Sequence, residues 1–502
     1  MVVRVILAFA LAATSAPEPA AARTYRVEHA IVGLLPVNVG APVTSPDGCH
    51  VAALRRDESK TAVWLDGKVV GSYDEVLENP VVFSTDSSRC AWVALRGGRH
   101  LVVVGGREYG GLDGVVQASL RLSPDGTHFA CAVGNRGRRY MLVDGEPGPT
   151  FDLVTDCVLS PTGGRYGYVA EDQTGQRAVI DGVAGRCYAT VTGLAFSANG
   201  RSSVYAASNT AGRWTVVANG VEGPWCDRLN SDSPVTSSDG AHVAYAGSNG
   251  EAAFAGIDGV AGATYDAVWT PVFAPAGSSV AYEARKGGAW LVVWDGVEGP
   301  AFDGMERQGL VFSSDGRRLA YVARRGPNAV VVVDGEESPG YDGATHLTFS
   351  RDGRRLAAGV RRGGQWAIRL NGEEGSWYDG IGEGSLSFSP DGKRCAYAVN
   401  MGRTWAVVVD GAVGRRYMMV NNTSLRFSPD GKSLAYIAQT SEKEWVLVLD
   451  GTEGPRYRGI VAGGPTFLGD GSLEYLVIEA LGVEGAGAVA LLVHRVRHVP
   501  RR

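Results

Sequence analysis

Short apolar runs alternate with polar turns along nearly the whole chain. The clearest copy, residues 385–420, contains the four runs SLSFS, RCAYAV, WAVVVDG and RRYMMV. Val, Tyr, Trp and Phe dominate these runs, which favours strands over helices. The first run ends in Ser-Pro-Asp-Gly and the third in Asp-Gly, both typical of tight turns because Gly reaches positive φ at no steric cost. The pattern predicts four antiparallel strands in each copy.

The Ser-Pro-Asp-Gly turn recurs at a nearly constant spacing, 37 to 40 residues from one copy to the next. Its copies are SPDG at 45–48, 123–126, 389–392 and 428–431, STDS at 84–87, SPTG at 160–163, SANG at 197–200, SSDG at 237–240 and 313–316, APAG at 274–277, SRDG at 350–353 and LGDG at 468–471. A period of this length indicates stacked supersecondary units. Twelve units of four antiparallel strands predict an all-β chain folded as a β-propeller.

Small and aromatic residues recur at fixed places after the turn. The fifth residue after the turn Asp is usually Ala, and the next is often Tyr, as in Ala320-Tyr321 and Ala396-Tyr397. The third run is apolar on both faces, which indicates a strand covered on both sides. We therefore expect the Ala to let neighbouring blades approach and the Tyr to fill the wedge between them. Tryptophans recur at the head of the third run and are interpreted as packing between blades: Trp64, Trp214, Trp290, Trp366, Trp405 and Trp445.

The units FSPDGKRCAYAV (388–399) and FSSDGRRLAYVA (312–323) resemble the WD-like propeller repeats of the TolB type. Such repeats also form the propellers of prolyl-oligopeptidase-like peptidases. The resemblance covers roughly residues 40–480. It implies a propeller with a binding surface, and it implies no catalytic residues.

The ring can close in two ways: one wide ring of about twelve four-stranded blades, or two six-bladed propellers split near residues 240–275. The TolB-type resemblance implies six blades in each propeller, which favours two. The even spacing leaves no room for a linker. The last unit also lacks a fourth run, and TYRVEHAIVG (24–33) resembles the missing one. We expect this N-terminal strand to complete the last blade and to cover strand edges that would otherwise be open, which favours a single ring.

The chain ends suggest export. Residues 1–22 read as a signal peptide, with Arg4, an apolar stretch and Ala20-Ala21-Ala22 as the cleavage site. We therefore expect residues 23–499 to form the repeat array and the product to be periplasmic or secreted. No later run approaches the length of a membrane span. The basic ending RVRHVPRR (495–502) is expected to be a solvated tail.

Composition and candidate chemistry narrow the function. The net charge of −5 argues against a nucleic-acid partner. Seven Cys without CxxC spacing give no support for zinc, although one or two disulfides remain open.

His50, His128 and His242 follow their turns at one register, but Arg takes this position elsewhere, so a basic strand start is expected rather than a metal site. We predict no cofactor and no metal. Asp residues after the fourth-run aromatic could together bind Ca²⁺ or sugar hydroxyls, but we expect each to form a local turn or to pair with a nearby Arg: Asp74, Asp152, Asp227, Asp266, Asp303, Asp342 and Asp379.

Charge is divided between the two faces of the predicted ring. In a four-stranded blade, the first and third turns share one face, and these turns carry Asp. The second turns lie on the other face and carry Arg and Lys, a set called here the Arg-rich rim: Arg55, Arg56, Arg285, Lys286, Arg324, Arg325, Arg361 and Arg362. A concentrated positive rim can hold an anionic partner.

The sequence therefore favours an exported, non-enzymatic propeller that binds a protein or an anionic polymer through this rim. The alternative is a propeller enzyme, lactonase- or lyase-like, with its site in the central channel. The innermost runs contain little acid, and no G-x-S-x-G or phosphate-binding loop occurs in a suitable setting.

Overall fold

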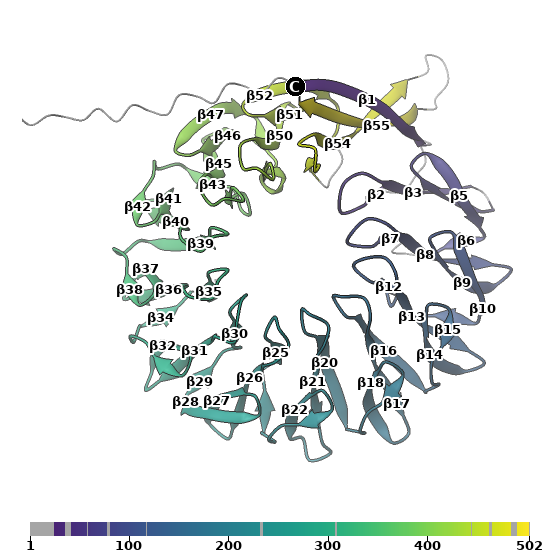
Figure 1. Ribbon diagram of the computed structural model, residues 1–502, viewed down its shortest axis with the longest axis vertical. Coiled ribbons are helices and arrows are strands. Elements are labelled where there is room, and N and C mark those ends of the chain that lie inside the picture. Colours follow the sequence, from purple (N-terminus) through teal and green to yellow (C-terminus); the bar gives the residue numbers. More distant parts are fainter. Residues whose placement is uncertain are drawn as a thin grey trace, which may run out of the picture.

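The repeats fold into a single ring of twelve blades in the computed structural model (Figure 1). The structure describes residues 25–35, 42–57, 59–77, 81–116, 118–230, 234–306, 309–442, 444–460, 464–482 and 489–500. The blades follow one another around the ring in chain order, so the structure selects the single ring over two six-bladed propellers. The propeller fold implied by the TolB-type resemblance is confirmed.

Each blade is an antiparallel sheet whose strands run in order from the centre of the ring outward. The strands of blades 1 to 4 are β2 (Val43–Thr44), β3 (Val51–Arg56), β4 (Thr61–Leu65), β5 (Lys68–Tyr73); β6 (Glu75–Val76), β7 (Val82–Phe83), β8 (Cys90–Arg96), β9 (Arg99–Val104), β10 (Arg107–Leu112); β11 (Gly114–Val115), β12 (Arg121–Leu122), β13 (Phe129–Asn135), β14 (Arg138–Val143), β15 (Glu146–Pro147); and β16 (Leu153–Leu159), β17 (Tyr166–Asp172), β18 (Gly175–Ile180), β19 (Val183–Ala184).

The strands of blades 5 to 8 are β20 (Thr190–Phe196), β21 (Ser203–Ser208), β22 (Trp214–Ala218), β23 (Val221–Glu222); β24 (Arg228–Leu229), β25 (Val235–Thr236), β26 (Val243–Asn249), β27 (Ala252–Ile257), β28 (Val260–Tyr265); β29 (Ala267–Val268), β30 (Val272–Phe273), β31 (Val280–Lys286), β32 (Ala289–Trp294), β33 (Val297–Glu298); and β34 (Gly304–Met305), β35 (Val311–Phe312), β36 (Leu319–Arg325), β37 (Asn328–Val333), β38 (Glu336–Glu337).

Blades 9 to 12 complete the ring. Their strands are β39 (Gly343–Phe349), β40 (Leu356–Arg362), β41 (Gln365–Leu370), β42 (Glu373–Glu374); β43 (Gly380–Ile381), β44 (Ser387–Phe388), β45 (Cys395–Met401), β46 (Thr404–Val409), β47 (Ala412–Tyr417); β48 (Met419–Val420), β49 (Arg426–Phe427), β50 (Leu434–Ser441), β51 (Glu444–Leu449), β52 (Thr452–Tyr457); and β53 (Thr466–Phe467), β54 (Leu473–Gly482), β55 (Val489–Pro500), β1 (Tyr25–Leu35). One 3-10 turn, η1 (Asn422–Ser424), precedes β49.

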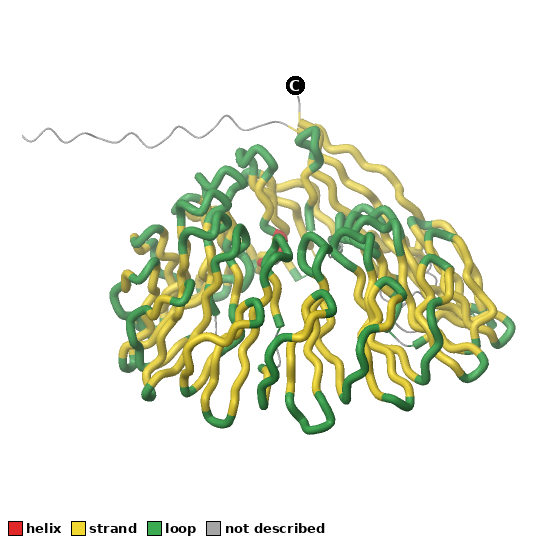
Figure 2. Tube along the Cα trace, turned by 60° about the horizontal axis from the view of Figure 1, so that its bottom comes forward, coloured by secondary structure: helices red, strands yellow, loops and turns green. Residues whose placement is uncertain are grey.

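The innermost strand of a blade has two forms. It is continuous in β16, β20 and β39, where a β-bulge interrupts its pairing. In seven other blades it is split into two short pieces, as in β29 and β30. The turns after these strands border the central opening (Figure 1), and turns close both ends of the blades (Figure 2). Within the described residues, no helix is long and apolar enough to cross a membrane.

The N-terminal strand closes the ring, as the sequence predicts. β1 pairs along β55 of blade 12, from Tyr25 opposite Pro500 to Leu35 opposite Leu491. Blade 12 also contacts blade 1, since Arg495 donates a hydrogen bond of 2.9 Å from Nη2 to the Cys49 carbonyl. The expectation of a solvated C-terminal tail was wrong for residues 495–500. They belong to β55, which pairs with β54 and β1, and the buried His498 ring lies next to Gly454 of blade 11.

The core consists of separate apolar layers between neighbouring blades. Ala320 of blade 8 is buried against blade 9, whereas Tyr321 is buried against blade 7, because successive side chains of a strand point to opposite faces. The small Ala and the large Tyr therefore have the roles that the sequence suggested. All seven Cys are free, and Cys90, Cys131, Cys157, Cys226 and Cys395 are buried in these layers, so the option of disulfides is not realised.

Candidate functional site

The repeated Asp residues stabilise the blades. In blade 10, the Ser389 hydroxyl donates to the turn residue Asp391, and Asp410 of the third turn accepts from the Cys395 amide at 2.8 Å and from Arg394 Nε at 2.9 Å. Arg394 also donates to the Lys432 carbonyl of the next blade. The same network recurs in most blades, so these carboxylates and the strand-start Arg hold turns together.

The three histidines at the strand start take the same role as Arg394. The Nδ1 atoms of His50, His128 and His242 lie 2.6–2.7 Å from the Oδ2 atoms of Asp66, Asp144 and Asp258, respectively. Each therefore pairs within its own blade and does not converge on a shared centre. The hydrogen bond with Asp258 raises the pKa of His242 above its ordinary value. The described residues contain no cluster of His, Cys, Asp and Glu able to hold a metal ion.

The Asp that follows the fourth-strand aromatic caps the second turn of the next blade. Asp303 accepts a hydrogen bond from the Gly326 amide at 2.6 Å, and Asp342 accepts from Gly363 at 2.7 Å. Asp74, Asp227 and Asp266 make the equivalent bond to Gly97, Gly250 and Gly288. The expected local turn is therefore wrong for these five residues, since each accepts from a backbone amide 21–23 residues further along the chain. Asp152 pairs with the nearby Arg138, as the sequence allowed.

Carboxylates of the outer strands neutralise much of the Arg-rich rim. Lys286 pairs with Glu298, Arg325 with Glu337 and Arg362 with Glu374, each twelve residues further along the chain. Arg55 pairs with Asp57, and Arg324 with Glu306. Arg56, Arg285 and Arg361 have no carboxylate partner among the described residues. The predicted residues do lie at the second turns, but the rim holds less free positive charge than the sequence suggested.

The Glu partners also connect neighbouring blades. The Tyr341 hydroxyl of blade 8 donates to Glu374 of blade 9 at 2.8 Å, and Tyr265 of blade 6 donates to Glu298 of blade 7 at 3.1 Å. Each Glu thus accepts from its own Arg or Lys and from the Tyr of the preceding blade. Binding of an anion by Arg362 would compete with this structural contact.

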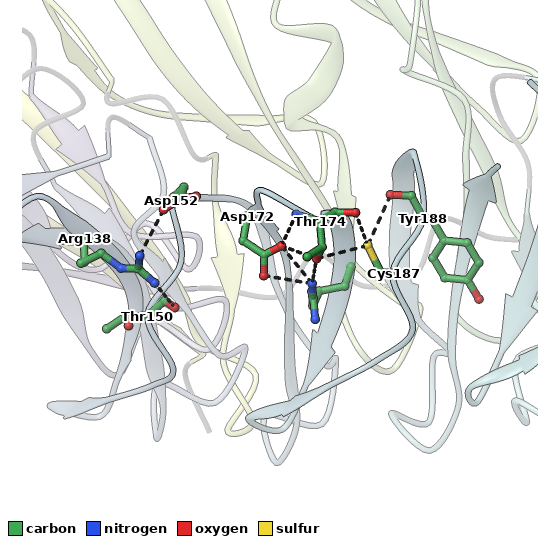
Figure 3. Close-up of polar contacts among 8 residues, drawn as sticks. Arg138, Thr150, Asp152, Asp172, Thr174, Cys187 and Tyr188 are labelled. Carbon is green, nitrogen blue, oxygen red and sulfur yellow. Dashed lines mark hydrogen bonds and ion pairs between the residues drawn. The ribbon is translucent and has the colours of Figure 1, made fainter. Parts of the chain in front are cut away.

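Paired charges occur beyond the predicted rim as well (Figure 3). Arg138 of blade 3 donates to Asp152 at 3.2 Å and to the Thr150 carbonyl at 3.1 Å. In the second turn of blade 4, Asp172 accepts from the Thr174 amide and from Arg177. The Cys187 thiol lies 2.8 Å from the Thr174 carbonyl (Figure 3). These polar groups are therefore already hydrogen-bonded to the backbone or to nearby side chains.

One blade departs from the repeat in a way that creates a pocket. Glu283 of β31 occupies a position that faces the next blade and is apolar in the other eleven blades. The equivalent residues are Leu54, Val93, Ala132, Val169, Ala206, Ala246, Val322, Gly359, Ala398, Ile437 and Leu476. The sequence carried this signal in the run VAYEA, where Glu stands two residues after the repeated Ala, but our sequence interpretation did not use it.

Two tryptophans accompany Glu283 on the same face of blade 7. Trp269 lies opposite Glu283, because its amide donates to the Glu283 carbonyl at 2.9 Å. Trp290 lies on the neighbouring strand β32 and stacks on Trp269, with ring centroids 6.1 Å apart and planes inclined by 24°. Trp269 is 53% exposed, although large aromatic side chains are usually buried in soluble proteins. Only Trp290 of this pair was singled out by the sequence.

The space between these residues and blade 8 forms a pocket of about 670 Å³. Trp269, Val272, Glu283 and Trp290 of blade 7 line it, together with Met305, Glu306 and Leu310 of blade 8; we call it the Trp–Glu pocket. Its walls are mostly apolar. The volume lies within the range of roughly 300–1,000 Å³ typical of small-ligand sites.

The Glu283 carboxyl is the distinctive charged group of this pocket. Among the described residues it has no hydrogen-bond or ion-pair partner, and burial raises its pKa to about 7. Glu306 is engaged by Arg324, and Arg285 lies opposite Trp290 at the end of β31. The pocket therefore combines an exposed aromatic pair with a carboxyl that is partly protonated near neutral pH.

Trp290 also differs from its equivalents in other blades. Trp214, Trp405 and Trp445 pack against apolar layers between blades, as the sequence predicted. The prediction that Trp64 stands at the head of its third strand was wrong: it lies near the end of β4 and is not equivalent to the others. Trp290 instead lines the Trp–Glu pocket. It differs from its equivalents because it stacks on Trp269, the residue that follows β29 (Ala267–Val268).

No protein-family model and no curated protein matches the sequence. Solved structures similar to the chain include one described as the eukaryotic initiation factor, with 11% identity and a TM-score of 0.33 over 68% of this chain and 87% of that one. TolB from Acinetobacter baumannii has 14% identity and a TM-score of 0.23, covering 58% and 77%. A putative 6-phosphogluconolactonase from Bacteroides uniformis has 14% identity and a TM-score of 0.24, covering 59% and 93%. Identities and TM-scores this low say nothing about the ligand or the reaction of this chain.

Proposed function

We propose that the chain is an exported, non-catalytic binding propeller that captures an organic cation in the Trp–Glu pocket. The observation that carries the proposal is Glu283, a carboxyl without a partner among the described residues, at a position that is apolar in every other blade. A partly buried carboxylate without a partner lowers stability. We expect a carboxylate at this position where a bound ligand supplies the positive charge that the protein does not.

The aromatic pair favours a cation over other ligands. An ammonium or guanidinium group is attracted to the face of Trp, and the attraction contributes roughly 0.5–2 kcal/mol depending on exposure. Trp269 presents this surface, and Glu283 lies beside it on the same sheet face. A neutral sugar could stack on Trp269, but it would leave the carboxylate charge uncompensated. We therefore favour an ammonium or guanidinium group, from a small amine or a basic side chain.

Binding is favoured over catalysis by the composition of the pocket. General acid–base chemistry usually combines two titratable groups with different roles. Of the two carboxyl groups that line the described part of the pocket, Glu306 is engaged by Arg324 and only Glu283 is unpaired. Export rests on residues 1–22, which lie outside the described residues. The anionic partner predicted for the Arg-rich rim remains a prediction.

Calorimetry with small cations tests the proposal. The chain from residue 23 is titrated with tetramethylammonium and with N-acetyl-lysine methylamide at pH 6 and pH 8, and with methyl glucoside as a neutral probe. The ionised fraction of a carboxyl with a pKa of about 7 rises from about one tenth to about nine tenths over this interval. We therefore expect the affinity for the cations to increase about tenfold between pH 6 and pH 8.

Matched variants separate the pocket from general charge effects. Glu283→Gln and Trp269→Ala should each weaken cation binding at pH 8 by tenfold or more, whereas Glu373→Gln removes an exposed carboxylate of blade 9 and should leave binding unchanged. Equal cation affinity in the wild-type chain and in Glu283→Gln would refute the proposal. Binding of methyl glucoside without binding of either cation would assign the pocket to a neutral carbohydrate instead.

A further inference from the structure

A second cavity lies between blades 8 and 9, where three departures from the repeat meet. In most blades the middle-strand Tyr lies opposite a Val of the third strand: Tyr168–Val179, Tyr205–Val217, Tyr282–Val293, Tyr321–Val332, Tyr397–Val408, Tyr436–Val448 and Tyr475–Val496. The Tyr hydroxyl reaches a Gly in the outer part of the preceding blade, and a Cβ at Gly375 would lie 3.6 Å from the Tyr397 hydroxyl.

Blade 9 has Ala358 in place of this Tyr and Arg369 in place of the opposite Val. Blade 8 has Ser338 in place of the Gly that the Tyr hydroxyl would approach. Ser338 is used locally, because its Oγ accepts from the Val331 amide at 2.9 Å and donates to the Pro339 carbonyl at 2.8 Å. The repeat therefore changes at both sides of one interface, and the change removes an aromatic ring and adds a cation.

A cavity of about 480 Å³ occupies the place of the missing ring. Loss of a buried side chain leaves space when the surrounding elements cannot collapse. Here hydrogen bonds between the turns fix the spacing of the two blades. Arg318 of blade 8 donates to the Arg354 carbonyl of blade 9 at 3.1 Å, and Ser314 donates to the Arg351 carbonyl. The cavity lies near the first and third turns, whereas the Trp–Glu pocket lies nearer the second turns.

Arg369 has donors that no described residue of the protein uses. Among the described residues its guanidinium has no hydrogen bond or ion pair, and its Nε is buried without a partner. Glu374 lies opposite Arg369 on β42, but it already accepts from Arg362 and from the Tyr341 hydroxyl. A buried polar group without a partner is uncommon and calls for an explanation.

The other charged groups around the cavity are largely paired. Asp334 accepts from Arg318 Nε at 2.8 Å, and Glu337 accepts from Arg325. The remaining groups in the described lining are Glu336 of blade 8 and Arg354 of blade 9, both exposed. In the described lining, two guanidinium groups (Arg354 and Arg369) and one carboxylate (Glu336) therefore have no ion-pair partner. A guanidinium presents a planar set of N–H donors that matches the paired oxygens of carboxylate and phosphate.

We propose that the cavity between blades 8 and 9 binds a small oxyanion, a carboxylate or phosphate group, through Arg369 with Arg354 at its mouth. This site is independent of the Trp–Glu pocket, because the two involve different interfaces and opposite ligand charges. The oxyanion would complete the hydrogen bonds of Arg369 and fill the space that Tyr occupies in other blades.

The test is thermal unfolding and calorimetry of the full chain from residue 23 with inorganic phosphate and with acetate, at constant ionic strength set with sodium chloride. Arg369→Gln removes the charge but keeps a polar side chain. The triple variant Ser338→Gly, Ala358→Tyr, Arg369→Val restores the repeat and fills the cavity. Arg351→Gln removes a neighbouring exposed positive charge outside the lining and is the matched control.

We expect saturable binding of at least one anion by the wild-type chain and by Arg351→Gln, and a loss of at least tenfold in affinity in Arg369→Gln and in the triple variant. The triple variant keeps the test meaningful if Arg369→Gln unfolds, because its interface is that of the other blades. Binding of phosphate alone identifies a phosphate site, and binding of acetate identifies a carboxylate site. Absence of binding in the wild-type chain, or equal binding in all variants, overturns the proposal.

Discussion

Tyr25 lies opposite Pro500 on the antiparallel strands β1 and β55, so the first and last described residues of the chain belong to one blade. The ring is closed by pairing between the two ends of the chain rather than by a covalent link. Stability of the whole propeller should therefore depend on short terminal segments.

Removal of residues 23–35 is expected to lower the melting temperature by at least about 5 °C. The deletion removes β1 and exposes the edge of β55. Removal of residues 495–502 should have an equally large effect, because residues 495–500 pair with β54 and β1. Removal of residues 501–502 alone serves as the control. Circular dichroism measures all three, and an unchanged melting temperature after loss of β1 would contradict closure by the chain ends.

His498 should make the closing blade sensitive to acid. Burial lowers the pKa of His498 to about 4, and its Nε2 lies 3.2 Å from the Tyr475 hydroxyl. An unfolded His has a pKa of about 6.5, so the unfolded chain binds more protons between these values. Stability is therefore lost as the pH falls from about 6.5 to 4, by up to about 3 kcal/mol. Denaturant unfolding of the wild-type chain and His498→Gln should show a weaker acid dependence in the variant.

Glu283→Val should stabilise the propeller at alkaline pH. Burial raises the pKa of Glu283 to about 7 from an ordinary value near 4.5, so the folded chain binds more protons between these values. The carboxyl then costs stability as the pH rises through this interval, by up to about 3 kcal/mol above pH 7. The variant should exceed the wild type at pH 8 and equal it near pH 4.5. The reverse change, Val322→Glu in blade 8, should destabilise at pH 8.

Replacements of Asp410 test the third-turn network. Asp410 has a φ of +51°, and it accepts from the Cys395 amide and from Arg394. Asn tolerates this conformation and takes the equivalent position in blades 5 and 9, as Asn219 and Asn371. Asp410→Asn should therefore cost less than about 1 kcal/mol, because it loses mainly an exposed ion pair. Asp410→Ala should cost about 1–3 kcal/mol through the lost cap and the strained φ. Equal unfolding free energies for the two variants would exclude this role.

The paired state of the Arg-rich rim also gives a measurable expectation. Arg325 and Arg362 pair with Glu337 and Glu374, and the Arg362 guanidinium lies 5.1 Å from the centre of the Tyr341 ring. Arg325→Ser with Arg362→Ser should lower stability by up to about 2 kcal/mol in total, since each exposed pair contributes up to about 1 kcal/mol. Arg56→Ser, which has no such partner among the described residues, is the control. No difference between the double variant and this control would show that the pairs contribute little.

Local features of the sequence were sufficient to predict the blades and their number. The Ser-Pro-Asp-Gly period predicts twelve blades because turns and strands depend on residues close in the chain. The leftover run at the N-terminus predicts β1 because an unpaired strand edge in the last blade needs a partner. The role of Asp303 did not follow from a local rule, since its carboxylate accepts from the Gly326 amide in the next blade, 23 residues along the chain.

The sequence by itself thus predicted the repeat, the four-stranded blade and the N-terminal strand of the last blade, whereas the structure decided between one ring and two. Only the tertiary structure decided which charges are free and where space remains. Arg362 reads as a rim cation in the sequence, yet Glu374 and Tyr341, the latter from the preceding blade, converge with it. Glu283 reads as a single irregular residue until Trp269 and Leu310 enclose it. Burial and charge pairing depend on atoms from neighbouring strands and blades, which the period within one blade does not specify.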